Sequence, residues 1–168
     1  MSYTSGGGDN LDVRERLGAM ERGDNFAPAT ARVLCTGPVY IPPFGGIVFP
    51  INSVSEVTGN IFEYIPGSQS LLIKQAGIFG HMVMFSGQPS GSANIVIALY
   101  QSPLNFFVLV SIPFQSEPYF FTPFVGGIQI VNVPSGGSDY QVNVALSGGT
   151  GSFTLNYVDI RLVYLGRR

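Results

Sequence analysis

From Val33 to the end of the chain, apolar and polar residues alternate in short runs separated by glycine, proline, serine and asparagine. β-branched and aromatic residues dominate these runs, and turn-forming residues recur about every 8–12 positions, which is typical of a β-sandwich or jelly roll. We therefore expect residues 33–168 to form one all-β, antiparallel jelly-roll domain of about ten strands. The strands are expected at 46–51, 59–64, 70–75, 78–86, 93–100, 105–112, 118–124, 127–133, 139–146 and 152–165.

Alternation within single runs predicts which face of a strand is buried. Residues 139–146 alternate apolar and polar side chains, as in a strand with one buried face. In the last run, Val158 and Ile160 point opposite to Asp159, which places Asp159 on the outer face. The apolar phase changes near Tyr157, so we expect a β-bulge there.

Two runs, 93–100 and 105–112, are apolar on both faces. Each strand of a two-layer sandwich has one solvent face, so these runs need additional cover, which a neighbouring subunit supplies most simply. We therefore expect the domain to associate with copies of itself. The candidate interface residues in the domain are large apolar side chains: Val96, Phe106, Phe107, Phe120, Phe124 and Tyr164.

Residues 1–32 follow a different pattern and are expected to form an N-terminal arm. Val13, Leu17 and Met20 have i, i+4, i+7 spacing, which places them on one side of a short helix. A helix of about three turns is marginal by itself. We therefore expect this apolar stripe to contact a neighbouring protein, and the three residues are further interface candidates.

Charge is concentrated in the arm, and the domain is nearly without it. Eight of the eighteen charged residues lie within the first 24 positions. Only seven lie between Val33 and Gly166, about 5% of that stretch, where a typical soluble domain carries about 25%. Such a surface is poorly protected against association. The seven are Glu56, Glu63, Lys74, Glu117, Asp139, Asp159 and Arg161.

The sequence offers little for catalysis, cofactor binding or metal binding. His81 is the only histidine and no acidic residue lies near it in sequence, so we expect a core or interface side chain; a ligand or pH-switch role is the alternative. Cys35 is the only cysteine, which excludes an internal disulfide and a cysteine-based zinc site, and we expect a small buried or half-buried thiol. The carboxylates are isolated, and Asp139 alone does not make a calcium site. We expect no enzyme, no cofactor and no metal site.

Nucleic acid and membrane are also unfavourable partners. The first 24 residues hold three arginines against five acids, so the arm would not neutralise phosphates. The longest apolar run, FFVLVSIPF, is about half the length of a membrane-spanning helix and contains a proline. The first residues, MSYTSGGGDN, have neither the charged nor the apolar region of a secretory signal.

The stretch GNIFEYIPGSQSLLIKQAGIFGHMVMFSG resembles the tumour-necrosis-factor-like jelly roll that is shared with complement globular heads. It is similar above all to the C-terminal domains of collagen-like spore-surface (exosporium) proteins and to related virion proteins. An apolar strand ends at Ala76-Gly77, Phe79 opens an alternating strand, NIVIALY follows a glycine-rich loop, and an aromatic-aliphatic strand closes the chain. The resemblance implies a ten-stranded jelly roll that usually forms trimers and has no catalytic centre.

We therefore expect a non-enzymatic structural protein whose jelly-roll subunits form homo-oligomers, trimers by the resemblance, and build or decorate a virion shell. The arm, residues 1–32, would contact neighbouring shell proteins. Two alternatives stay open. One is a bacterial spore-surface protein, although residues 1–32 contain no Gly-X-Y repeat. The other is a trimeric head that binds a receptor or glycan through the loops SGQPSGS and SGGTGS.

Overall fold

The computed structural model describes residues 28–101, 105–123 and 125–167 of the chain. Every regular element in these residues is a β-strand, which confirms the predicted all-β class. The described residues form twelve strands, two more than expected. They are β1 (Thr30–Ile41), β2 (Gly46–Phe49), β3 (Ser53–Ser55), β4 (Phe62–Tyr64), β5 (Leu71–Ile73), β6 (Gly77–Ser90), β7 (Ala93–Gln101), β8 (Asn105–Phe114), β9 (Phe120–Phe121), β10 (Val125–Val131), β11 (Ser138–Ser147) and β12 (Ser152–Gly166).

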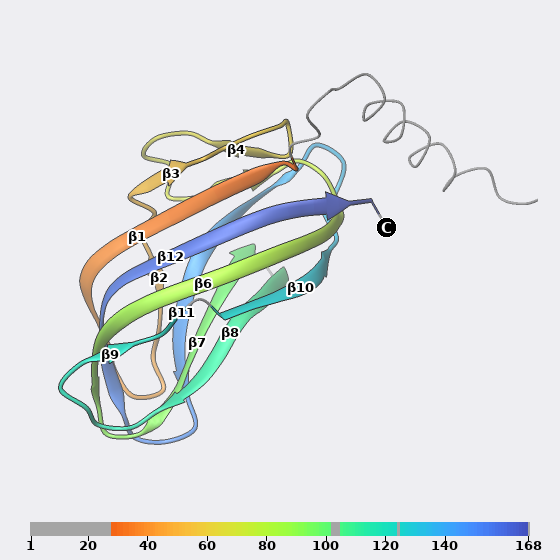
Figure 1. Ribbon diagram of the computed structural model, residues 1–168. Coiled ribbons are helices and arrows are strands. Elements are labelled where there is room, and N and C mark those ends of the chain that lie inside the picture. Colours follow the sequence, from red (N-terminus) through yellow and green to blue (C-terminus); the bar gives the residue numbers. More distant parts are fainter. Residues whose placement is uncertain (1–27, 102–104, 124, 168) are drawn as a thin grey trace, which may run out of the picture.

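The strands form two antiparallel sheets that pack face to face (Figure 1). Sheet I has the order β10-β6-β12-β1-β3, and β9 pairs with β6. Sheet II has the order β4-β5-β11-β7-β8, and β2 pairs with β11. Strands β8 and β10 are the last strands of their sheets and lie on the same side of the sandwich, where the Gln129 side-chain amide donates to the Val108 carbonyl.

Strand β1 was not among the expected strands, yet it lies in the interior of sheet I. It pairs with β12 from Thr30↔Val163 to Ile41↔Phe153, so its first three residues come from the segment assigned to the arm. Its register shifts between Thr36 and Val39, around a Gly37-Pro38 pair. Glycine and proline in a run normally indicate a turn. Here they mark an irregularity inside one long strand.

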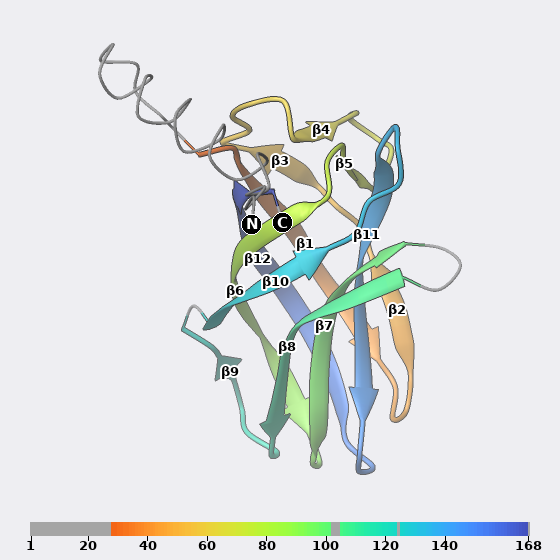
Figure 2. The ribbon, with the colours of Figure 1, turned by 90° about the vertical axis from the view of Figure 1, so that its right-hand side faces the viewer.

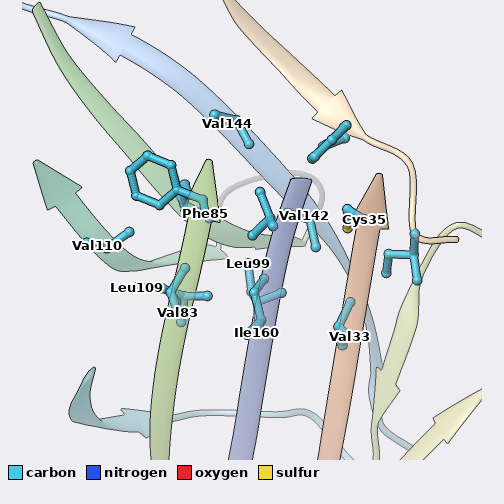
Figure 3. Close-up of a cluster of buried hydrophobic side chains, with 14 of the residues drawn as sticks. Val33, Cys35, Val83, Phe85, Leu99, Leu109, Val110, Val142, Val144 and Ile160 are labelled. Carbon is cyan, nitrogen blue, oxygen red and sulfur yellow. The ribbon is translucent and has the colours of Figure 1, made fainter. Parts of the chain in front are cut away.

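The core lies between the inner faces of the two sheets, and β-branched and aromatic side chains fill it. Strand β11 buries every second residue from Ser138 to Leu146, as its alternation predicts. Figure 3 shows side chains from both sheets meeting in this layer. The labelled residues are Val33, Cys35, Val83, Phe85, Leu99, Leu109, Val110, Val142, Val144 and Ile160.

Strand β12 confirms the predicted bulge and corrects the expected environment of one residue. Its register against β6 shifts between Leu155 and Tyr157. Asp159 does lie on the outer face of sheet I, but it is fully buried. Alternation predicts the direction in which a side chain points, but it does not predict what covers that side chain. Arg32 of β1 forms an ion pair with Asp159 and covers its carboxylate.

His81 is buried, as expected, and connects the two sheets. Its Nε2 lies 2.9 Å from the Leu109 carbonyl oxygen on β8, and because a carbonyl only accepts, Nε2 carries the donated proton. Burial lowers the pKa of the imidazole, and this hydrogen bond opposes the shift. The ring fills the space above Gly127 on β10, where a Cβ would lie 3.0 Å from Cε1.

Candidate subunit interface

The outer face of sheet I exposes a group of large apolar side chains at one end. Along each strand these side chains alternate with residues of the core. On β6, for example, the inward residues are Phe79, His81, Val83 and Phe85. Four side chains are strongly exposed: Ile128 at 70%, Ile130 at 52%, Leu165 at 43% and Met82 at 41%. We call the following set the apolar patch: Ile78, Met82 and Met84 of β6, Ile128 and Ile130 of β10, and Val163 and Leu165 of β12.

Two glycines bring the side chains of the patch together across three strands. Gly80 pairs with both Ile128 and Val163, and a Cβ on it would lie 3.7 Å from Leu165 Cδ1. Gly126 pairs with Met82, and a Cβ on it would lie 3.2 Å from Met82 Cγ. Leu165 and Met82 therefore lie over backbone that carries no side chain. The result is a continuous apolar surface of the kind that marks an interaction site on a soluble protein.

An ionic cluster borders the patch on β12 and β1. Arg32 Nη2 donates to Asp159 Oδ2 at 2.7 Å, and Arg32 Nε lies 3.1 and 3.2 Å from the two carboxylate oxygens. Arg161 Nε lies 4.0 Å from Asp159 Oδ1, and Arg32 Nη1 lies 3.5 Å from Glu56 Oε1. The hydrogen bond and the charge of Asp159 raise the pKa of Arg32. Two cations and two anions balance here, so the cluster adds no net charge to the face.

The other end of the same face carries exposed aromatic rings. Tyr40 is 59% exposed, Tyr119 55% and Phe121 53%. Tyr40 pairs with Thr154, and Phe121 pairs with Ser86, which places both on the outer side. Tyr157 lies between them and the ionic cluster: burial raises the pKa of its phenol, and the charges of Asp159 and Tyr119 add to that effect. The outer face of sheet I is thus apolar or aromatic at both ends.

The residues expected at an interface lie in several environments. Val96 is half-buried, and its neighbours Ile95 and Ile97 belong to the core. Tyr164 packs edge-on against Phe79 with ring centroids 5.2 Å apart, and Phe120 stacks on Phe85 at 5.7 Å, so both line the inner layer. The remaining candidates lie outside the part of the chain whose side chains are described: Val13, Leu17, Met20, Phe106, Phe107 and Phe124.

Sequence reasoning missed the apolar patch. Within VGGIQIV, alternation favours Ile128 and Ile130 as the buried face of a strand, whereas the structure turns them outward and directs Gln129 to the Val108 carbonyl. The available signal was in β6, where Met82 and Met84 alternate with the core residues and make both faces of the strand apolar. A strand that is apolar on both faces at the middle of a sheet needs cover on both.

Within the described ranges, no three histidine, cysteine, aspartate or glutamate side chains gather in a way that could hold a metal ion. The same residues contain no helix long and apolar enough to cross a bilayer.

Several solved structures share this architecture. Murine APRIL at pH 5.0 aligns with 80% of this chain and 98% of its own, at 8% identity and a TM-score of 0.52. The globular domain of zebrafish complement 1qA aligns with 84% of this chain and 100% of its own, at 12% identity and a TM-score of 0.50. PRD1 vertex protein P5 aligns with 83% of this chain and 98% of its own, at 14% identity and a TM-score of 0.52. The fold is the tumour-necrosis-factor-like jelly roll.

At these identities the similarity shows the fold alone, and it confirms the resemblance to the tumour-necrosis-factor-like jelly roll. No protein-family model matches the chain, and no curated protein matches it. The jelly roll here places β10, β6, β12 and β1 in one sheet, and the exposed apolar patch lies on the outside of that sheet.

Proposed function

We propose that this protein is a structural subunit that forms a homotrimer through the outer face of sheet I and decorates or builds the surface of a virion. The observation that carries the proposal is the apolar patch, which is exposed on a jelly roll whose surface has few charges. The jelly roll of PRD1 vertex protein P5 supports the location, since its name places that protein at a vertex. The trimer is the assembly that the family resemblance implies.

The patch can supply a substantial part of the association energy. Fully burying one large aliphatic side chain gains about 1.5–3 kcal/mol. The exposed fractions of Ile128, Ile130, Leu165 and Met82 together amount to about two such side chains, so one face offers roughly 3–6 kcal/mol. The aromatic end of the face adds to this. Association must offset the loss of rotational and translational freedom, about 4–15 kcal/mol, so the patch needs the aromatic end of the face as a second contribution.

The arm provides the second contact in this proposal. Residues 1–32 hold the stripe Val13, Leu17 and Met20, and the first 24 of them hold eight of the eighteen charged residues. A charged segment with one narrow apolar side suits attachment to a neighbouring shell protein. The absence of a Gly-X-Y repeat from residues 1–32 favours the virion over a collagen-linked spore-surface protein.

A receptor- or glycan-binding head is the second candidate function, and one observation favours it. The loops that follow β6 and β11 lie together, because Gly151 N donates to the Ser92 carbonyl at 3.0 Å. Beside them is a shallow groove of about 470 Å³. Polar residues that line this groove include Asn94, Gln115 and Glu117, which could donate to and accept from a sugar. Loss of glycan-array binding in an Asn94→Ala variant that stays trimeric would support this candidate.

The trimer is tested by replacing Ile128 with aspartate. Size-exclusion chromatography with light scattering should give the wild type three times the 18.0 kDa subunit mass at micromolar concentration. Ile128→Asp places a charge in the buried patch and should give the single mass with an unchanged β-type circular dichroism spectrum. Ile65→Asp is the matched control, because Ile65 is 63% exposed in the β4–β5 loop, away from the patch, and should leave the trimer intact.

A monomeric wild type at these concentrations would contradict the proposal. Dissociation of the Ile65→Asp control to the same extent would also contradict it, since any added charge would then have the effect attributed to the patch.

A further inference from the structure

A shallow groove of about 420 Å³ opens where β5 leads into β6 and where β10 ends. Its apolar lining residues are Ala76, the exposed Ile130 and the almost fully buried Val131, and Lys74 and Arg167 supply positive charge. No acidic side chain lines it. We propose that this groove seats the N-terminal arm of the same chain, with the stripe Val13, Leu17 and Met20 against these apolar residues. The full lining is Lys74, Gln75, Ala76, Gly77, Ile130, Val131, Asn132 and Arg167.

The arm leaves the domain beside this groove. Tyr164 N donates to the Ala29 carbonyl at 2.8 Å, and Thr58 Oγ1 donates to the Pro28 carbonyl at 3.0 Å, so the first described residues are held in place. The side chain of the same Tyr164 reaches the groove: its hydroxyl accepts from Gln75 Nε2 at 2.8 Å, and its ring fills the space above Gly77. One residue therefore contacts both the origin of the arm and the wall of the groove.

The connecting segment is long enough to reach. Strand β12 lies between β1 and β6, and β10 follows β6, so the groove is two to three strand spacings from the origin of the arm. At about 4.8 Å per spacing, this distance is roughly 10–15 Å. Seven extended residues from position 23 to position 29 span up to about 23–25 Å. The arm can therefore reach the groove of its own chain without strain.

The arm as a whole is negatively charged and the groove lining is positively charged, although residues 13–20 themselves hold two arginines and one glutamate. Residues 1–27 hold five acids and three arginines, a net charge of −2. The groove offers Lys74 and Arg167; Lys74 also pairs with Glu63 at the surface, where both side chains remain partly exposed. An amphipathic segment that lays its apolar side on a groove and its acids on surrounding cations is a common recognition mode. A second copy and an unrelated protein lack the short connection that favours the chain's own arm.

Cross-linking of the full-length protein tests this seat. Arg16→Cys lies beside the stripe in sequence, and Asn132→Cys lies in the groove. The native Cys35 is buried and its thiol pKa is raised to about 12, so it stays out of the reaction. Mild oxidation of the double variant should give a disulfide within one chain, seen as a faster band on a non-reducing gel whose yield does not depend on protein concentration.

Two matched variants separate docking from random collision. Arg16→Cys with Thr150→Cys moves the second thiol to the exposed loop between β11 and β12 and should react at least tenfold more slowly. Adding Val13→Ser and Leu17→Ser to the original pair should lower its rate to that same level. Equal rates in all three variants, or products that only join different chains, would overturn the proposal.

The groove is proposed as the seat of the stripe in the unattached subunit, and contact with a shell protein would take the stripe out of the groove. Ile128→Asp reports on subunit mass, whereas the disulfide reports on the arm within one chain. A failed cross-link with an intact trimer would remove the groove as the seat of the arm and leave the proposed function standing. A monomeric wild type with an efficient cross-link would support the groove as the seat of the arm and contradict the proposed trimer.

Discussion

In the turn between β1 and β2, Phe44 has a left-handed backbone conformation, which is unfavourable for a residue with a bulky side chain. Its φ is +55°, and its side chain is 70% exposed. Gly45 N donates to the Pro42 carbonyl at 2.9 Å, which closes a turn with Pro43 and Phe44 at its centre. A turn with positive φ at its third residue usually has glycine there. The exposed ring gains little from burial that would offset the strain.

We expect Phe44→Gly to stabilise the fold. Removing the left-handed strain raises the free energy of unfolding by about 1–2 kcal/mol, and the greater freedom of glycine in the unfolded chain lowers it by about 0.4–1 kcal/mol, for a net gain of about 0.5–1 kcal/mol. Chemical denaturation of the purified protein measures the free energy of unfolding. Phe44→Ala is the control, because it removes the ring and keeps the Cβ, so its stability should stay near that of the wild type. A less stable Phe44→Gly variant would show that the ring makes contacts that outweigh the strain.

His81 shows how one polar residue fits an apolar core. Phe79 and Val83 flank it on its own strand and are almost fully buried, and the Leu109 carbonyl is its hydrogen-bond acceptor. Burial is the main cause of its lowered pKa, because the protonated ring would be a charge in apolar surroundings. The expectation of a packed histidine was correct, and its partner on β8 could not be read from the sequence.

The pH dependence of stability should carry the signature of His81. Its folded pKa lies below the unfolded value of about 6.5, so the unfolded state binds more protons below pH 6.5 and the free energy of unfolding falls there. His81→Gln keeps a donor and does not titrate. It should be about 1–2 kcal/mol less stable at pH 7.5, and the gap should narrow as the pH falls to 5. Urea titrations at both pH values measure the gap, and a constant gap would contradict the assignment.

At the scale of elements, β1 and β12 are joined by more than their backbone ladder. Asp159 of β12 is fully buried on the outer face and is held by Arg32 of β1, which also reaches Glu56 after β3. Thr30 adds contacts to the same segment, since its Oγ1 donates to the Glu56 carbonyl at 2.8 Å. This cluster ties β12, β1 and the residues that follow β3 into one unit.

Removing Arg32 alone should cost more than removing the pair. Arg32→Met leaves a buried carboxylate without its strongest partner, whereas Arg32→Met with Asp159→Leu replaces both charges by apolar groups of similar size. We expect a clearly lower urea midpoint for the single variant and recovery of at least half of the loss in the double variant. If the double variant were the less stable of the two, the pair would be net stabilising and the expectation would be wrong.

The elements that follow the simple rules were predictable, and those that depend on tertiary contacts were not. Strand β11 and the bulge in β12 follow from alternation, which reflects only the pleat of a strand. Strand β1 was missed because Gly37-Pro38 interrupts its pattern, although its pairing with β12 resumes at Val39. The outward direction of Ile128 depends on the register in which β10 pairs with β6, and local sequence carries no record of that.

As a whole, the molecule has two different ends. Figure 2 shows the connections after β1, β6 and β11 at one end of the sandwich, and the C-terminus at the other. The origin of the arm lies at the second end, because Ala29 is held by Tyr164 near the end of β12. In the proposed assembly, the arm end faces the shell and the glycine- and serine-rich loops face away from it. One face of sheet I remains for contact between subunits.

This division predicts that deleting residues 1–27 separates attachment from folding. Every described strand remains, and so do Pro28 and its hydrogen bond to Thr58, so the circular dichroism spectrum and the trimer mass should not change. Attachment to the shell should be lost, because the deletion removes Val13, Leu17 and Met20. Co-sedimentation with particles that lack the protein measures attachment, and full-length Val13→Ser, Leu17→Ser, Met20→Ser serves as a variant that keeps the charges of the arm. If the truncated trimer sedimented with the particles as efficiently as the wild type, attachment would have to be assigned to the jelly roll itself.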